Sequence, residues 1–295
     1  MPKNSSKPKS EYAIQTVTNA LRMLEVFHSE NEMGVSELAR ELGLHKNNAF
    51  RLLATLELAG YIQQTPATEL YHLGPRCLEL GRAFSRSHTL MSQARPILEE
   101  LADEIGETAH LGVLSGREVV HLDGVLPDQL VLTSLRIGDR VDAHCTAIGK
   151  ALLAGEITNR SFGAGGARPG AGVDAASGDG SRDSTTDSRV ERDFFAAEFD
   201  GQLARYTDAT LDDAAKLMDD LRVVQLRGYA VDLEEFAPGL RCVAAPIRDS
   251  SARVVAALSL SGPSGRLDEE TLHGRAASAI SAAASRLSSE LGSPI

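Results

Sequence analysis

The sequence predicts an α+β protein of two domains: a small N-terminal domain of short helices closed by a hairpin, and a larger C-terminal domain with a helix-flanked, mainly antiparallel sheet. Three observations lead to this prediction. Apolar residues recur at helical spacing up to about residue 60, and they alternate at strand spacing in several runs after residue 107. The chain of 295 residues, 42% of them hydrophobic, is also long enough to bury two cores.

Composition narrows the classes of protein that the chain can form. No apolar run is long enough to span a bilayer, and no apolar segment follows the lysines of MPKNSSKPKSE, so we expect a cytoplasmic protein without signal peptide or membrane contact. The three cysteines lie far apart without a CxxC pattern, which favours reduced thiols over disulfides or structural zinc. Residues 1–12 are expected to form a disordered basic tail.

The formal net charge of -11 is unevenly distributed along the chain. Residues 1–87 hold ten of the 30 lysines and arginines and nine of the 41 acidic residues, a net charge of +1. The remainder therefore carries a net charge of -12. Because salt screens charges beyond about 8 Å, a near-neutral N-terminal domain with a basic face can still bind phosphates.

Two helices are predicted at the start of residues 13–74. TVTNALRMLEVF has apolar residues three and four apart behind Thr16 as N-cap, and its predicted buried stripe is Val17, Ala20, Leu21, Leu24 and Phe27. GVSELARELGL predicts a short second helix, with Ser36 at the cap position and Gly43 at the end.

The third predicted helix, HKNNAFRLLATLELAG, has an apolar and a polar side. The apolar stripe consists of Ala49, Leu52, Leu53, Leu56 and Ala59, and the polar side consists of Asn47, Asn48, Arg51 and Thr55. YIQQTPATELYHL then predicts two short strands, 61–64 and 70–73, around a Pro-Ala-Thr turn. Three helices followed by a hairpin form a winged helix-turn-helix, expected over residues 13–74.

The third helix begins with basic and amide side chains and has no acidic residue in its first turn. An acidic residue there would interact favourably with the helix dipole and stabilise the helix by about 0.3–1 kcal/mol. In a helix-turn-helix this end enters the major groove, where Lys, Arg and Asn bind base edges or phosphates. The alternatives are an ordinary solvated helix face, or a domain that contacts proteins instead of DNA. Lys46 and Arg51 favour DNA, because a protein-contact surface would more often show exposed aromatic residues.

From Val17 to Leu73, and on into GPRCLELG, the sequence resembles the DNA-binding domain of IclR-type bacterial transcriptional regulators, named for the isocitrate lyase regulator. The resemblance implies double-stranded operator DNA as a partner. The DNA contacts that it implies are Lys46, Asn47, Asn48 and Arg51 on the recognition helix, Arg40 on the second helix, and Gln63 and Gln64 on the wing.

Residues 75–91, PRCLELGRAFSRSHTLM, predict a linker helix. In the family that the sequence resembles, this helix joins the two domains and pairs the subunits, which implies a homodimer or a dimer of dimers. Pairing suits DNA recognition, since two half-sites about 34–36 Å apart need two recognition helices. The alternative is that the segment is simply the first helix of the C-terminal domain.

Residues 92–295 alternate helix and strand patterns. SQARPILEELADEIG predicts a helix, TAHLGVL and REVVHLD predict a hairpin, and LVLTSLRI predicts a third strand. A short helix is expected from about Ala147 to Ala154, and TLDDAAKLMDDLRVVQLRG predicts a longer one capped by Thr210 and ended by Gly228. Three more strands lie within YAVDL, RCVAAPI and VVAALSLS, before a final helix over 268–291.

Residues 163–189 contain Val173 as their only large aliphatic residue. Such a segment buries too little apolar surface to offset its ordering entropy, so a disordered insertion is expected at about 160–192. No Gly-Lys-Ser/Thr follows its glycines, which argues against a phosphate-binding loop.

GYAVDLEEFAPGLRCVAAPIRD, residues 228–249, resembles the C-terminal signature of the IclR family, and HCTAIGKALLA at 144–154 extends the match. Residues at the expected spacings are Gly228, Asp232, Glu235, Cys242, Ala244, Ile247 and Asp249. Arg248 departs from the pattern, which usually has an aromatic residue or histidine there. The resemblance implies a GAF-like effector-binding domain for small organic or aromatic acids.

An effector pocket is predicted within this region. Alternation along VVAALSLS separates Val254, Ala256, Leu258 and Leu260 on one face from Val255, Ala257, Ser259 and Ser261 on the other. The two hydroxyls, beside Cys242 and Ala244, leave room and donors for a small ligand, and Asp232 is the expected acceptor or orienting group. Backbone amides at a helix start can hold a carboxylate, and those expected here belong to Ala147, Ile148 and Gly149. A solvated sheet face is the alternative.

Catalysis and metal binding are not expected. His110, His121 and His144, with Cys145 or Cys242, could form a nucleophile and base or a metal site, but their spacing specifies no mutual geometry. The sequence therefore predicts a ligand-responsive DNA-binding transcriptional regulator without a cofactor. The alternative is a sensor-type small-molecule-binding protein whose N-terminal domain mediates protein contacts.

Overall fold

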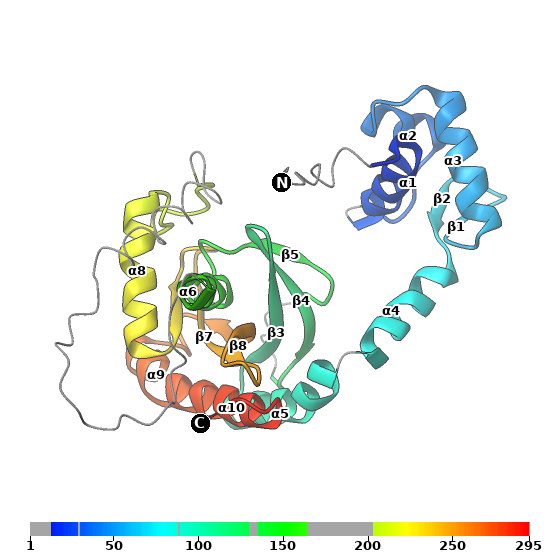
Figure 1. Cartoon of the computed structure of the whole chain (residues 1–295). Coiled ribbons are helices and arrows are strands. Elements are labelled where there is room, and N and C mark those ends of the chain that lie inside the picture. Colours follow the sequence, from blue (N-terminus) through cyan, green and yellow to red (C-terminus); the bar gives the residue numbers. More distant parts are fainter. Residues whose placement is uncertain (1–12, 29, 88, 130–134, 164–202, 295) are drawn as a thin grey trace, which may run out of the picture. The chain divides into compact units, whose positions relative to one another are not determined.

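The computed structural model describes residues 13–28, 30–87, 89–129, 135–163 and 203–294. The chain divides into two compact units, residues 1–88 and 89–295, and each is described by itself (Figure 1). The tail predicted at 1–12 and almost all of the insertion predicted at about 160–192 lie outside the described residues. No helix in the described part of the chain has the length and apolar character needed to cross a membrane.

The N-terminal unit contains the three predicted helices and the hairpin, which confirms the winged helix-turn-helix. Its elements are α1 (Gln15–Glu25), the 3-10 turn η2 (Val26–His28), α2 (Val35–Glu41), α3 (Lys46–Leu58), β1 (Ile62–Gln64), β2 (Tyr71–Leu73) and α4 (Pro75–Ser87). β1 and β2 are antiparallel. The fully buried side chains of its core are Met23, Leu38, Ala49, Leu53 and Ile62.

Both predicted N-caps in this unit are wrong by two residues. α1 begins behind Ile14, so Thr16 lies inside the helix. α2 begins behind Gly34 rather than Ser36, and the Glu37 carboxylate accepts a hydrogen bond from the Gly34 N–H at 3.0 Å. A side chain that reaches back from the third helical position therefore satisfies the helix start in place of a capping hydroxyl.

The buried stripe of α1 also differs from the prediction. Met23 is fully buried, whereas Val17 and Leu21 are 52% and 56% exposed. Only the C-terminal part of α1 packs against the core, together with Phe27 in η2. The N-terminal half of α1 therefore presents an apolar face to its surroundings. Ala59, predicted to continue the buried stripe of α3, is exposed as well.

The C-terminal unit is a six-stranded antiparallel sheet covered by helices on both faces (Figure 1). Its strand order is β5-β4-β3-β8-β7-β6. The strands are β3 (Thr108–Ser115), β4 (Glu118–Val125), β5 (Arg140–Asp142), β6 (Ala230–Leu233), β7 (Leu240–Arg248) and β8 (Val254–Pro263). The helices are α5 (Thr89–Ile105), α6 (Ala147–Gly163), α8 (Ala214–Arg227) and a last helix formed by α9 (Glu269–Thr271), the π segment η3 (Leu272–Ala276) and α10 (Ala277–Glu290).

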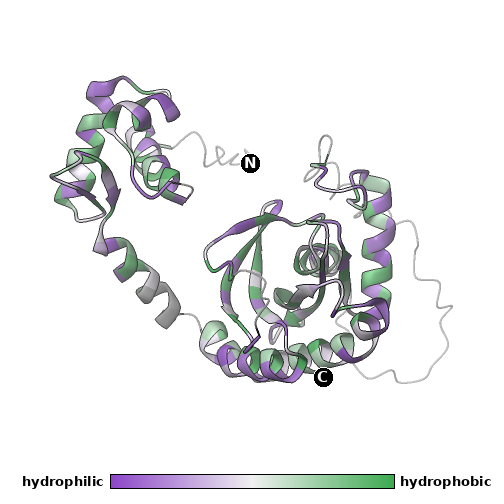
Figure 2. Cartoon of the chain, turned by 180° about the vertical axis from the view of Figure 1, so that it is seen from behind, coloured by the Kyte–Doolittle hydropathy of each residue, from purple (hydrophilic) through white to green (hydrophobic). Residues whose placement is uncertain are grey.

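The sheet separates two apolar cores. α5 and α10 pack on one face, where Val243 and Leu258 are buried, and α6 packs on the other, with α8 against it, where Cys242 and Ala257 are buried. Hydrophobic residues accordingly gather along the sheet and on the helix sides that face it (Figure 2). The two faces of β7 and β8 are thus assigned to different cores, which determines which side chains can line a site.

Three predictions for this unit need correction. Residues 130–134 of the predicted strand LVLTSLRI lie outside the described residues, and Leu135 to Ile137 are not in a strand; the edge strand is β5, which was not predicted. α6 continues to Gly163 instead of ending near residue 154. The cap of α8 is Asp213, whose carboxylate accepts from two backbone N–H groups, rather than Thr210.

The predicted alternation along β8 is broken near its start. The register of β7 and β8 shifts after Ile247, where Arg248 pairs with Val254. This irregularity turns Val254 to the α6 side, where it is buried with Ala257 instead of with Ala256. The faces predicted for the rest of the strand, including Ser259 and Ser261, hold.

Candidate functional site

The N-terminal end of α3 presents the predicted polar surface. Lys46, Asn47, Asn48 and Arg51 are all exposed, while Ala49 and Leu53 are fully buried beneath them. His45 stands at the N-cap without a side-chain capping bond, and its carbonyl accepts the N–H groups of the first turn. No acidic side chain lies in that turn. An anion such as a DNA phosphate can therefore approach the positive end of the helix dipole without repulsion.

The other predicted DNA-contacting side chains differ in their exposure to solvent. Arg40, in the last turn of α2, and Gln63, on the wing, are exposed. Gln64 is half-buried, and its Nε2 donates to the backbone carbonyl of Glu69 at 2.9 Å. Glu69 has a positive φ of 59°, so this bond supports a strained turn. Gln64 thus holds the shape of the wing, and Gln63 is the better placed of the two for contact.

One aromatic residue, for which no position was predicted, is exposed on α3. Phe50 is 56% exposed and stands one helical turn from Lys46 and Asn47, on the same side of the helix. Phe50 belongs neither to the predicted apolar stripe of this helix nor to its predicted polar side, so the sequence pattern assigned it no role. An apolar side chain among polar ones can contact a thymine methyl group in the major groove, so its exposure is compatible with DNA as the partner.

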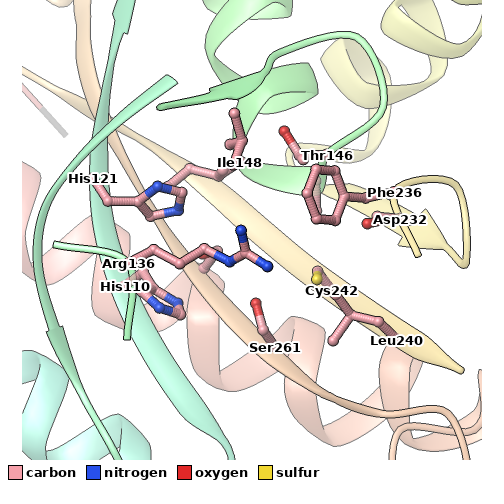
Figure 3. Close-up of a pocket in the computed structure, with 13 residues that line it drawn as sticks. His110, His121, Arg136, Thr146, Ile148, Asp232, Phe236, Leu240, Cys242 and Ser261 are labelled. Carbon is pink, nitrogen blue, oxygen red and sulfur yellow. The ribbon is translucent and has the colours of Figure 1, made fainter. Parts of the chain in front are cut away.

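A cavity of about 210 Å³ lies between the sheet and the start of α6 (Figure 3). Six of the seven predicted effector residues line it, which are Ala147, Ile148, Asp232, Cys242, Ser259 and Ser261. Residues that the sequence did not assign to it are His110, His121, Arg136, Val141, Thr146, Phe236 and Leu240. The hydroxyls of β8, the side chain of Cys242 on β7 and the N-terminus of α6 thus line the same cavity.

Gly149 is the predicted residue that does not line the pocket. Its N–H donates to the hydroxyl of Thr146 at 3.3 Å, and that hydroxyl donates to the Asp142 carbonyl at 3.0 Å. A Cβ at position 149 would lie 2.3 Å from the Cα of Ala143. The prediction for Gly149 is therefore corrected: glycine is needed for close packing, and its amide is used in capping. The amides of Ala147 and Ile148, at the start of the helix, remain for a ligand.

Among the described residues that line the pocket, Asp232 is the one acid. It is fully buried, and its Oδ1 accepts the N–H of Glu235 at 2.7 Å. Its Oδ2 is buried without an oxygen or nitrogen donor among the described residues. Burial, together with the charge of Glu235, raises the pKa of Asp232 to about 7. Near neutral pH the side chain is therefore divided between a carboxylate that accepts and a carboxylic acid that can donate.

A buried ion cluster includes Glu235, the residue whose backbone N–H donates to Asp232. The Nζ of Lys150, which is 1% exposed, lies 2.5 Å from a Glu235 oxygen and 3.0 Å from Oδ2 of Asp220. Burial lowers the pKa of Lys150, but the two carboxylates outweigh that effect, so its pKa is raised and the ammonium stays charged. The cluster ties α6, α8 and the segment after β6 together. Loss of Lys150 would leave the Glu235 and Asp220 carboxylates without a counter-charge, at a cost of about 3–5 kcal/mol.

Arg136 supplies positive charge to the pocket. Its guanidinium extends into the space (Figure 3) and lies 4.9 Å from the centre of the Phe236 ring. The two histidines of the pocket pack edge to face at 5.1 Å, and burial with the charge of Arg136 lowers the pKa of His121 to about 4, so that ring is neutral. Sequence reasoning missed Arg136 because its segment was read as a strand. The part of the chain after residue 87 holds 20 of the 30 lysines and arginines, so the sequence alone does not single out Arg136.

The thiol and imidazole groups of the pocket do not form a nucleophilic pair or a metal site. Burial raises the pKa of Cys242 well above its ordinary value, so it stays a thiol with little nucleophilicity. Within the described ranges, no three His, Cys, Asp or Glu side chains gather in an arrangement that could hold a metal ion. The pocket instead offers a guanidinium, two helix-start amides and two hydroxyls around one small space, and the side chains of Ile148, Phe236 and Leu240 add apolar surface to its lining. This combination suits a small ligand with a carboxylate.

Both units match models of known protein families. Residues 16–66 match the IclR helix-turn-helix domain, and residues 83–161 and 192–289 match the bacterial transcriptional regulator IclR C-terminal domain. The gap between the last two segments coincides with the predicted insertion.

Known proteins are similar over nearly the whole chain. The HTH-type transcriptional regulator BhcR of Paracoccus denitrificans is 33% identical over 270 residues, which cover 92% of this chain and 85% of BhcR. The regulator XynR of Escherichia coli is 33% identical over 263 residues, which cover 88% of this chain and 90% of XynR. The crystal structure of Thermotoga maritima IclR is 26% identical, covers 95% of this chain and 100% of that one, and has a TM-score of 0.65.

Proposed function

This chain belongs to the IclR family of bacterial transcriptional regulators, and we propose that it binds operator DNA through the start of α3 and responds to a small organic or aromatic acid held in the pocket of the C-terminal unit. As a family member it is a ligand-responsive DNA-binding regulator and not an enzyme. The helix-turn-helix match favours DNA over the protein-contact alternative. A cytoplasmic location, expected from the sequence, stays a prediction.

The observation that carries the proposed effector class is the position of Arg136. A single guanidinium faces the helix-start amides of α6 and the hydroxyls of Ser259 and Ser261 across a small space with apolar walls. A carboxylate there gains charge-assisted hydrogen bonds, and an aliphatic or aromatic body gains apolar contacts. Asp232 does not repel such an anion when it is protonated, because it can then share its proton with the ligand.

The DNA-binding surface is assigned to Lys46, Asn47, Asn48 and Arg51, with Arg40 and Gln63 as further contacts. All of these side chains are exposed and lie on the helix-turn-helix or its wing. Phosphate contacts from the basic side chains position the protein, and the asparagines and Arg51 can bind base edges.

We further propose that two copies bind one operator. Support comes from exposed apolar side chains in the N-terminal unit. They are Ile14 at the N-cap of α1, Val17 and Leu21 on α1, and Leu78 and Leu80 on α4. The response to the effector requires two arrangements of the two DNA-binding domains in the dimer, with different affinities for DNA. Effector binding changes DNA affinity only if these two arrangements bind the effector unequally.

The effector class is tested with a panel of small carboxylic acids and their neutral amides, measured by thermal shift and by release of DNA carrying the promoter of the chain's own gene. We expect at least one acid to bind and its amide to fail. Arg136→Gln should remove the response, and Arg140→Gln, an exposed arginine outside the pocket, should keep it. Equal binding of acids by wild-type protein and Arg136→Gln would contradict the assignment.

A further inference from the structure

A second cavity, of about 430 Å³, lies on the α10 side of the sheet, away from the effector pocket. It is formed by the C-terminal ends of α8 and β7 together with one side of α10. We call it the second pocket, and its polar and charged lining residues are Arg227, Arg248, Ser281, Ser285, Ser288, Ser289 and Ser293. None of the residues of the effector pocket contributes to it.

Within the described part of the chain, the second pocket has two positive charges and no ion pair that compensates them. Arg227 and Arg248 are its only charged lining residues, and neither has a carboxylate partner among the described residues. The nearest acids in sequence are engaged elsewhere. Asp249 accepts from Ser251 and from the Arg253 backbone, and Glu290 lies 3.5 Å from Arg286. Two guanidinium groups therefore share a partly closed space in the acidic part of the chain.

Both guanidinium groups are partly desolvated and only partly satisfied. Burial lowers the pKa of Arg248, whose Nη1 donates to the Ala252 carbonyl at 3.1 Å. The Nε of Arg227 donates to the Tyr229 carbonyl, and its guanidinium lies 4.8 Å from the centre of the Tyr229 ring. The Nη2 of Arg227 is buried without an acceptor among the described residues. A buried donor without an acceptor costs about 1–3 kcal/mol, so a rotation of this flexible side chain toward an anion in the pocket would lower the free energy.

Hydroxyl donors stand beside the two charges. Ser281 and Ser285 are one turn apart on α10, and their hydroxyls make no hydrogen bond with other described residues. Ser288 is already used, since its hydroxyl accepts the Arg248 N–H and donates to the Ala284 carbonyl. The pocket thus offers guanidinium and hydroxyl donors from three different elements.

We propose that the second pocket binds a phosphate group, either free phosphate or the phosphate of a small monoester. A tetrahedral oxyanion accepts hydrogen bonds from several directions at once, as donors on α8, β7 and α10 require, whereas a planar carboxylate is satisfied by one guanidinium fork. The volume leaves room for the organic part of an ester. This site is independent of the acid that the effector pocket binds.

The proposal is tested by titrating the full-length protein with inorganic phosphate and with glycerol 3-phosphate at constant ionic strength, using calorimetry and the thermal midpoint. Glycerol and acetate are the control ligands. We expect phosphate or its ester to bind and to raise the midpoint, with the tighter of the two identifying the source. Arg248→Gln and Arg227→Gln should each weaken this binding at least tenfold, while Arg253→Gln, an exposed arginine outside the pocket, should not.

The stability of the variants separates a binding role from a structural one. Without phosphate, Arg248→Gln should be at least as stable as the wild type, because it removes a partly buried charge that has no counter-ion. Binding that persists in both glutamine variants, or no binding at all by the wild type, would overturn the proposal. So would an Arg248→Gln variant that loses stability or changes its sedimentation without any effect of phosphate, since the arginine would then serve folding or a contact between copies.

Discussion

Asp232 and Arg136 bring opposite charges into the effector pocket, and the balance between them determines which ligands the pocket accepts. Arg136 contributes a guanidinium to the lining, whereas Asp232, whose pKa is raised to about 7, changes its charge near neutral pH. The groups around Asp232 differ in sign: Glu235 opposes its ionisation and Lys150 favours it. The pocket is therefore a better receptor for an anion when Asp232 carries its proton.

This balance predicts a pH dependence. The folded-state pKa of Asp232 lies above its ordinary value of 3.8, so the folded protein holds a proton that the unfolded chain has lost between about pH 4 and 7. As the pH rises from about 4 to 7, the free energy of unfolding of the wild type should therefore decrease relative to that of Asp232→Asn, by at most about 4 kcal/mol. Denaturant unfolding of both proteins at several pH values measures the difference. A difference that does not change with pH would contradict the assignment.

Ser259 and Ser261 should matter for the effector and not for DNA. Replacing both with alanine removes two hydroxyls from the pocket wall and leaves α3 unaltered. We expect normal DNA affinity without effector and a loss of effector-induced release in a gel-shift titration. Ser250→Ala, an exposed serine outside the pocket, serves as the control. Intact release in the double variant would refute the contribution of these hydroxyls.

Arg51 should contribute to DNA binding alone. Arg51→Ala removes an exposed side chain above a buried helix face, so folding should be unchanged while operator affinity falls by about 1–3 kcal/mol. Fluorescence anisotropy with labelled operator gives the affinity, and thermal shift with the effector checks the pocket. Arg222→Ala, on α8 of the other unit, removes the same charge and should leave DNA binding unchanged. Equal loss in both variants would indicate an effect of net charge only.

At the scale of elements, α6 occupies the central place in the C-terminal unit. Its first residues line the effector pocket, Lys150 anchors the buried ion cluster, and Gly155 lets the helix approach β8 closely. A Cβ at position 155 would lie 2.6 Å from the side chain of Val254, the residue that the strand irregularity turns toward α6. The position of the pocket relative to β8 thus depends on one close helix–strand contact.

This contact predicts opposite results for two helical glycines. Gly155→Ala should destabilise the protein by about 1–3 kcal/mol, because the added methyl group overpacks the contact with Val254. Gly274→Ala, where a Cβ meets nothing within 4 Å, should leave stability unchanged or raise it by up to about 1 kcal/mol. Denaturant unfolding compares them, and equal effects of the two substitutions would show that the close contact is absent.

At the scale of the whole molecule, charge is divided between DNA binding and sensing. Residues 1–87 carry a net charge of +1 and the remainder carries -12. The acidic unit contributes little attraction to DNA, so affinity has to come from the small N-terminal unit, and two copies on one operator double the available contacts. The uncovered apolar residues of α1 and α4 are consistent with such pairing.

Pairing predicts a geometric requirement on the operator. Light scattering should give at least twice the 31.4 kDa mass of one chain. An operator with two half-sites should bind much more tightly than one half-site, and insertion of about 5 bp between them should abolish the gain, because the second site then faces the opposite side of the duplex. A monomeric mass together with indifference to spacing would contradict the homodimer.

The sequence by itself determined most of the elements, the family and six of the thirteen residues that line the effector pocket. Helical and strand periodicities are local, so the three helices, the wing and five of the six sheet strands could be placed from their side-chain patterns. The faces of α3 and of the end of β8 followed from the same periodicities, and with them the exposed Arg51 and the pocket-facing Ser259 and Ser261.

Only the tertiary structure decided which charges meet. Arg136, Phe236 and the paired histidines reach the pocket from segments whose periodicity says nothing about it, and the short strand β5 had no pattern of its own. The role of Gly149 in packing, the turn of Val254 toward α6 and the proton held by Asp232 depend on atoms contributed by distant parts of the chain. Close approach and desolvation are properties of the folded space around a group, and for that reason no sequence spacing could show them.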